Sequence, residues 1–147
     1  MRALVLVLAL AVVLVCALPA FAQADEPGAI SSLKAIMAAE AGYAKAYPEH
    51  GYACKLSELG PPTGNKVQGP EAASLLDPVI ASGKDAGYKF ELSCPTPSKP
   101  RIEYKVSATP LNDKAGRIFC GSQGGIVRTG PDAKTCLKNG TLVKESH

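Results

Sequence analysis

The first periodic stretch after the apolar amino terminus has its apolar residues at helical spacing. They recur at steps of three and four, with Ile36 and Tyr43 widening the same stripe: Ile30, Leu33, Met37, Ala41, Ala44 and Tyr47. Lys34, Glu40 and Lys45 lie away from the centre of this stripe. The pattern predicts an amphipathic helix that begins near Ala29 and packs one face on a core.

The segment that follows predicts where this helix ends. The ring of Pro48 disfavours helical geometry for Tyr47, so we expect the helix to end at about residues 46–47, with Tyr47 packed on a sheet. Gly51 allows a turn that a side chain would obstruct. Ser57-Glu58-Leu59 predicts a short helical turn, and residues 60–70 predict a loop. Residues 71–82 are weakly helical, and their candidates for burial are Leu75, Leu76, Val79 and Ile80.

Two later segments alternate apolar and polar residues with period two. The inward positions are Tyr88, Phe90, Leu92 and Cys94 in the first, and Ile102, Tyr104, Val106 and Ala108 in the second. They predict two half-buried antiparallel strands whose outward Lys and Glu residues pair across the strands. Residues 117–120 and 126–128, on either side of GSQGG, predict a third and a fourth strand. One helix face and one sheet face must be buried together, so the fold class is α+β: an N-terminal amphipathic helix packed on an antiparallel three- to four-stranded sheet.

The amino terminus has the three-part pattern of a secretory signal. Arg2 precedes an unbroken apolar run over residues 3–18, and Ala20-Phe21-Ala22 supplies small residues for cleavage after Ala22. As a helix, the sixteen apolar residues before Pro19 would reach about 24 Å, less than the roughly 30 Å of a bilayer core. We therefore expect residues 1–22 to be a signal peptide and residues 23–147 to be a single secreted or periplasmic domain. A retained membrane anchor is the alternative.

The cysteine count changes once the signal is removed. Cys54, Cys94, Cys120 and Cys136 remain, and an even number in a small exported domain predicts two disulfides with three possible connectivities. The wide spacings and the presence of only two histidines disfavour zinc. Cys94 ends the first strand on its apolar face, while Cys54 follows the end of the helix. The placement of the predicted elements therefore favours Cys54–Cys94, with Cys120–Cys136 brought together by the last hairpin and turn.

The sequence contains no recognisable catalytic set. His50 is the only interior histidine, and it lies in a Pro-Gly turn where a solvated side chain is expected. A thiol–base pair of His50 with Cys54 would need a free thiol. The formal net charge is +3 with charges of both signs interspersed, which excludes the basic stripe typical of nucleic-acid binding. We therefore predict a non-enzymatic protein without cofactor or metal, in which most tyrosines serve the core.

Residues 44–59, AKAYPEHGYACKLSEL, and the strands around YKFEL and IEYKV carry a resemblance to a known family. The chain resembles the globular head of type IV pilin-like proteins, including the major pseudopilin of type II secretion. In that family a long N-terminal helix is followed by a short helix and an antiparallel sheet. The resemblance also implies that Cys120 and Cys136 form the disulfide loop that closes many pilin heads. It spans roughly residues 29–137.

One departure from the family concerns assembly. Pilin subunits lose a short leader after a glycine and carry a glutamate near the new N-terminus, whereas here no glycine precedes Gly28 and no acid precedes Asp25. We therefore expect an exported, non-catalytic structural or interaction protein with a pilin-like head and an unidentified protein partner. Two alternatives are a membrane-anchored pilin or pseudopilin subunit, and a small exported ligand-binding protein or enzyme of another type.

Overall fold

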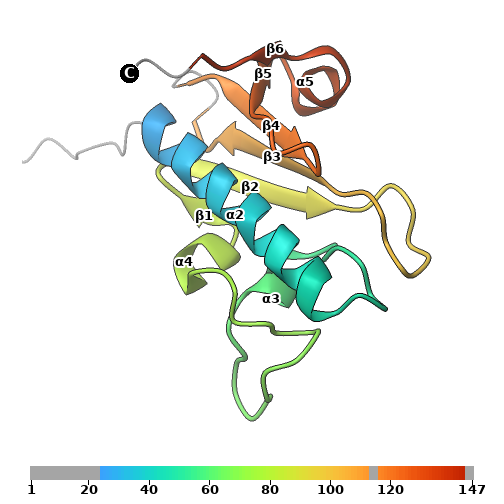
Figure 1. The fold of residues 1–147 in the computed structure, drawn as a ribbon. Coiled ribbons are helices and arrows are strands. Elements are labelled where there is room, and N and C mark those ends of the chain that lie inside the picture. Colours follow the sequence, from blue (N-terminus) through green and yellow to red (C-terminus); the bar gives the residue numbers. More distant parts are fainter. Residues whose placement is uncertain (1–23, 113–115, 145–147) are drawn as a thin grey trace, which may run out of the picture.

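A computed structural model describes residues 24–112 and 116–144, so the predicted signal peptide lies outside the described residues. The elements in chain order are α2 (Glu26–Ala46), α3 (Leu56–Leu59), α4 (Pro78–Ala81), β1 (Lys84–Asp85), β2 (Tyr88–Ser93), β3 (Lys105–Pro110), β4 (Ile118–Ser122), β5 (Arg128–Gly130), α5 (Ala133–Asn139) and β6 (Thr141–Leu142). The strands form one antiparallel sheet in the order β1-β2-β3-β4-β5-β6. Helix α2 crosses one face of this sheet (Figure 1). The predicted α+β class is confirmed, with six strands instead of three or four.

Helix α2 begins and ends as its flanking residues dictate. The Asp25 carboxylate accepts a hydrogen bond of 3.1 Å from the Gly28 amide, and proline occupies the first turn. The helix ends at Ala46, which confirms the predicted effect of Pro48. Tyr47 is half-buried at the edge of the core, where its ring centroid lies 5.0 Å from that of Tyr43.

The buried face of α2 is rotated relative to the predicted stripe. Leu33, Ile36 and Tyr43 are fully buried, whereas Ala41 is exposed. Glu40, predicted to lie away from the packed stripe, is also fully buried, so that prediction is wrong. The returning chain supplies a backbone donor to its carboxylate, which a pattern of apolar spacing does not reveal.

Strand β2 keeps the predicted alternation, with Tyr88 and Phe90 buried and Lys89 and Glu91 exposed. The next strand begins later than predicted, at Lys105, and Ile102 is 74% exposed although it was expected to face inward. The reason is that the chain before β3 pairs with Gly51 through an isolated parallel bridge at Arg101, and Arg101 is the buried residue there.

The predicted cross-strand charge pairing is wrong. The register of β2 and β3 places Lys89 opposite Thr109 and Glu91 opposite Ser107. Lys89 instead pairs with Glu91 along the same strand, at 2.8 Å. Because this pair is exposed on both sides, it adds little to stability.

The C-terminal part contains a helix where a turn was expected. Asp132 caps α5 by accepting a hydrogen bond of 2.8 Å from the Thr135 amide. Helix α5 contacts β4 and β5. In β4, Phe119 belongs to the core beneath α2, and the neighbouring Cys120 points to the opposite face because side chains alternate along a strand. Helix α5 therefore covers the other face of the sheet at this edge.

Residues 71–82 form only one helical turn, α4, at their carboxyl end. Leu76 is buried, whereas Leu75 and Val79 are exposed, so the predicted burial of the latter two is wrong. Ser74 has a left-handed φ of 54°, which interrupts a helix, and the Leu75 amide donates to Leu59 of α3 instead. The loop that connects α3 to α4 projects from one end of the domain (Figure 1).

Candidate functional site

Two disulfide bonds connect the sheet to other segments of the chain. Cys54 bonds to Cys94, with their Cα atoms 5.2 Å apart, and Cys120 bonds to Cys136, with their Cα atoms 6.0 Å apart. Both pairs match the connectivity predicted from the sequence. The first joins the chain that follows α2 to the end of β2, and the second joins β4 to α5.

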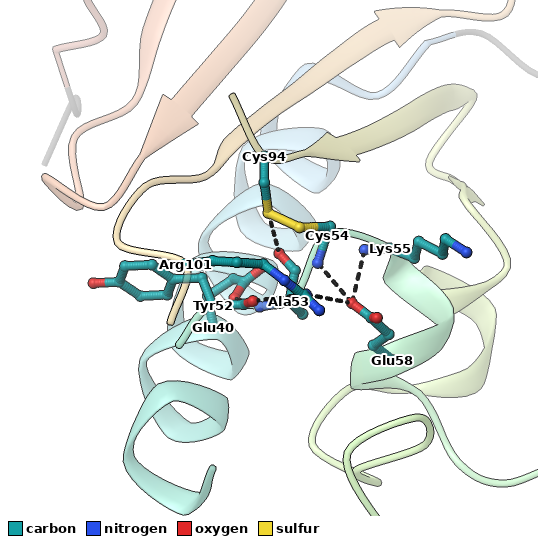
Figure 2. Close-up of a disulfide and its surroundings, with 8 residues drawn as sticks. All are labelled: Glu40, Tyr52, Ala53, Cys54, Lys55, Glu58, Cys94 and Arg101. Atoms are coloured by element: carbon teal, nitrogen blue, oxygen red, sulfur yellow. Dashed lines mark hydrogen bonds and ion pairs between the residues drawn. A yellow bond between two sulfur atoms is a disulfide. The ribbon is translucent and has the colours of Figure 1, made fainter. Parts of the chain in front are cut away.

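Polar side chains gather around the Cys54–Cys94 bond. The chain between Tyr47 and α3 turns back along the helix end, and Arg101 approaches it from the segment before β3 (Figure 2). Backbone hydrogen bonds of 2.9 Å fix this approach: the Arg101 amide donates to the His50 carbonyl, and the Tyr52 amide donates to the Arg101 carbonyl. We call this cluster of Glu40, residues 52–54, Glu58 and Arg101 the helix-end cluster.

The Glu58 carboxylate is the centre of one half of the helix-end cluster. Its Oε2 accepts hydrogen bonds from the amides of Cys54 at 2.6 Å and Lys55 at 3.2 Å. The same oxygen lies 3.2 Å from Nη1 of Arg101, which also donates to the Tyr52 carbonyl at 3.0 Å. Because both side chains of this ion pair are largely buried and hydrogen-bonded to main chain, the pair holds the returning segment in one conformation.

Glu40 forms the other half. Its Oε2 accepts a hydrogen bond of 2.8 Å from the Ala53 amide, while its buried Oε1 has no hydrogen-bond partner among the described residues. Burial raises the pKa of Glu40 to about 8, although the hydrogen bond from Ala53 acts in the opposite direction. Desolvation thus outweighs that bond and favours the neutral acid.

His50 and Cys54 do not form a thiol–base pair, because the sulfur of Cys54 is bonded to Cys94. The His50 side chain is 21% exposed, less than the solvated loop position that the sequence predicted. Its Nδ1 lies 2.9 Å from Nζ of Lys99, and its carbonyl accepts from Arg101. The residue thus takes part in joining the helix end to the segment before β3.

A surface hollow of about 270 Å³ lies between α3, α4 and the loop that connects them. Its polar lining residues are Ser57, Thr63, Lys66, Glu71 and Ser82. All five are exposed, so they do not form the desolvated, convergent set that activates groups in a catalytic pocket. Within residues 24–112 and 116–144, no group of three or more His, Cys, Asp or Glu side chains is placed to hold a metal ion.

Sequence reasoning found the cysteines of this region but missed Glu40, Glu58 and Arg101. One signal was present for Glu58: an acid three residues after the start of a helical turn often accepts from free amides at that end. No local pattern singles out Arg101, whose partners lie more than forty residues away. Apart from Oε1 of Glu40, the side-chain polar groups described here bind main chain or one another, so they hold the segment after α2 in place.

Comparison of the chain with protein-family models, with curated proteins and with solved structures found no match. Among the described residues, no helix has both the length and the apolar character needed to cross a bilayer. The two disulfides are typical of a protein that folds in an oxidising compartment.

Proposed function

We propose that this chain is an exported, non-catalytic structural or interaction protein with a pilin-like head, secreted or periplasmic. The observation that carries the proposal is the order and packing of its elements. The long helix α2 lies across an antiparallel sheet, and the short helix α3 follows α2 in the chain. The Cys120–Cys136 bond closes the C-terminal edge of the sheet. This is the arrangement that the resemblance to pilin heads implies.

The use of charged groups supports a structural role. The Glu58–Arg101 pair holds the segment after α2, and the Arg117 guanidinium binds Glu26 at the other end of the same helix, at 2.8 Å. Together with the disulfides, these contacts fix both ends of α2 and the final strands. A rigid head of this kind suits a protein that presents a surface to another protein.

The processing of the amino terminus tests the export half of the proposal. The full chain with a C-terminal tag is expressed in a bacterial host, and the intact mass of the protein is measured. We expect a mass that begins at Gln23. The variant Ala22→Phe should retain the signal, because signal peptidase needs a small residue there, whereas Ala17→Phe within the apolar run should be cleaved normally. Full-length protein in the membrane fraction would instead favour the anchored subunit.

Photo-crosslinking in the native cell tests the interaction half. A photoreactive residue replaces Val67 or Ile102, which are 84% and 74% exposed. We expect a discrete protein adduct from at least one position, and none from the buried control position Phe90. Monomer alone at every exposed position tested would contradict the proposed role.

A further inference from the structure

Glu40 is a carboxyl group placed in the hydrophobic core of the domain. It lies on α2 between Ile36 and Tyr43, both fully buried, and its own exposed fraction is 0%. Its single hydrogen bond within the described residues comes from the amide of Ala53, in the segment stapled by the disulfide. Figure 2 shows the Glu40 side chain directed from the helix to this segment. One bond therefore links the last turns of α2 to the returning chain.

The charged and titratable groups that face Glu40 do not supply an ion pair. Arg101 favours the charged carboxylate through space, but its guanidinium is bonded to Glu58 and to the Tyr52 carbonyl. Glu58 carries a like charge and disfavours ionisation of Glu40. Two further titratable neighbours are Tyr43, one turn along the same helix, and Tyr104 before β3. Burial raises the pKa of both phenols, which keeps them neutral, and an ionised phenol would be negative and could not compensate Glu40.

A carboxylate in this position would be a buried charge with one hydrogen bond and an unpartnered oxygen. Burying an unpaired charge costs far more than burying a neutral acid with the same contacts. We propose that Glu40 is a proton-operated latch: the neutral acid allows the Tyr52–Cys54 segment to close over the end of α2, and loss of its proton favours an opening of that packing that lets water reach the carboxylate. The Cys54–Cys94 bond keeps the released segment attached, so the opening is local.

The direction of the pH effect follows from the two states. In the unfolded or opened chain the pKa of Glu40 is near its ordinary value of 4.5, and burial raises it to about 8 in the closed fold. At a pH between these two pKa values, Glu40 is ionised in the open state and protonated in the closed state. Stability from this site is therefore complete below pH 4.5 and is lost as the pH rises to about 8.

Three proteins test the latch: the wild type, Glu40→Gln and the control Glu91→Gln. Glutamine can accept the Ala53 hydrogen bond but cannot ionise, whereas Glu91 is an exposed carboxylate on β2. Equilibrium urea unfolding with intact disulfides is measured from pH 5 to pH 9. From the two pKa values, the unfolding constant of the wild type should rise relative to that of Glu40→Gln by up to several hundredfold. Glu91→Gln should behave like the wild type.

A direct titration keeps the proposal testable should Glu40→Gln fail to fold. In wild-type protein with ¹³C-labelled glutamate, the carboxyl resonance of Glu40 should titrate well above those of exposed glutamates, and hydrogen exchange at Ala53 should accelerate beyond its chemical pH dependence over the same range. A Glu40 resonance that titrates with the exposed glutamates would overturn the latch. Equal pH dependence of unfolding in the wild type and Glu40→Gln would overturn it as well.

Discussion

Substitution of Gly51 by alanine should destabilise the fold far more than an ordinary turn substitution. Gly51 has a φ of 73°, in the left-handed region, and a Cβ atom there would overlap with the backbone carbonyl oxygen and amide nitrogen of Arg101. Both obstructing atoms belong to main chain and cannot rotate away. Residues 50–52 and the segment that contains Arg101 would therefore have to move apart.

The expected loss of stability has two parts. A left-handed alanine costs about 1 kcal/mol relative to glycine. Separation also breaks the two backbone hydrogen bonds between Arg101 and residues 50 and 52, each of which contributes roughly 0.5–1.5 kcal/mol. We therefore expect Gly51→Ala to lower the free energy of unfolding by about 3 kcal/mol.

Gly64→Ala is the matched control. Gly64 also has a left-handed φ, of 63°, but no heavy atom lies within 4 Å of the position a Cβ would take. It should lose only the conformational part, about 1 kcal/mol. Urea unfolding followed by circular dichroism, with disulfides intact, measures both variants. If their free energies of unfolding agree within about 0.5 kcal/mol, the close approach of Arg101 does not determine the need for glycine.

Two further predictions concern the Cys120–Cys136 bond and the ion pair at the start of α2. The double replacement Cys120→Ser with Cys136→Ser should lower stability by about 3 kcal/mol in the chain-entropy model for a 16-residue separation. Hydrogen exchange should rise in α5 while α2 stays protected, and equal loss of protection in both helices would contradict this. Glu26→Gln should cost less than about 1 kcal/mol at neutral pH, since its ion pair with Arg117 is partly exposed. The hydrogen bonds from Arg117 lower the pKa of Glu26, so this contribution is present above the ordinary glutamate range and disappears in acid, as an acid titration of both proteins would show.

The elements that the sequence predicted well are those whose determinants are local. Pro48 ends α2 through its own ring, and the alternation from Tyr88 onward is visible within six residues. Strands β1 and β6 could not be predicted from a pattern, because two residues cannot show a period. Helix α5 was missed although Asp132, a good capping residue, precedes it, since the glycines and proline around it favoured a turn.

The helix-end cluster could not be predicted because its contacts are non-local. Polar residues on an amphipathic helix are assigned to the solvent side, and only the return of the chain places the Ala53 amide against Glu40. The same holds for Ile102, which was assigned inward from its alternation with Tyr104. Its neighbour Arg101 takes the buried position because Gly51 lies alongside it.

The disulfides also have a simple order along the chain. Residues 54–94 and residues 120–136 form two loops that neither overlap nor nest, so the first of these four cysteines pairs with the second and the third pairs with the fourth. Consider a chain that enters an oxidising compartment amino end first. When Cys94 enters, Cys54 is the only earlier thiol of this domain. When Cys136 enters, Cys54 and Cys94 are already joined, so Cys120 is the only free thiol. An oxidase that joins thiols in order of appearance would therefore make both native bonds directly, without the thiol–disulfide exchange that an isomerase catalyses.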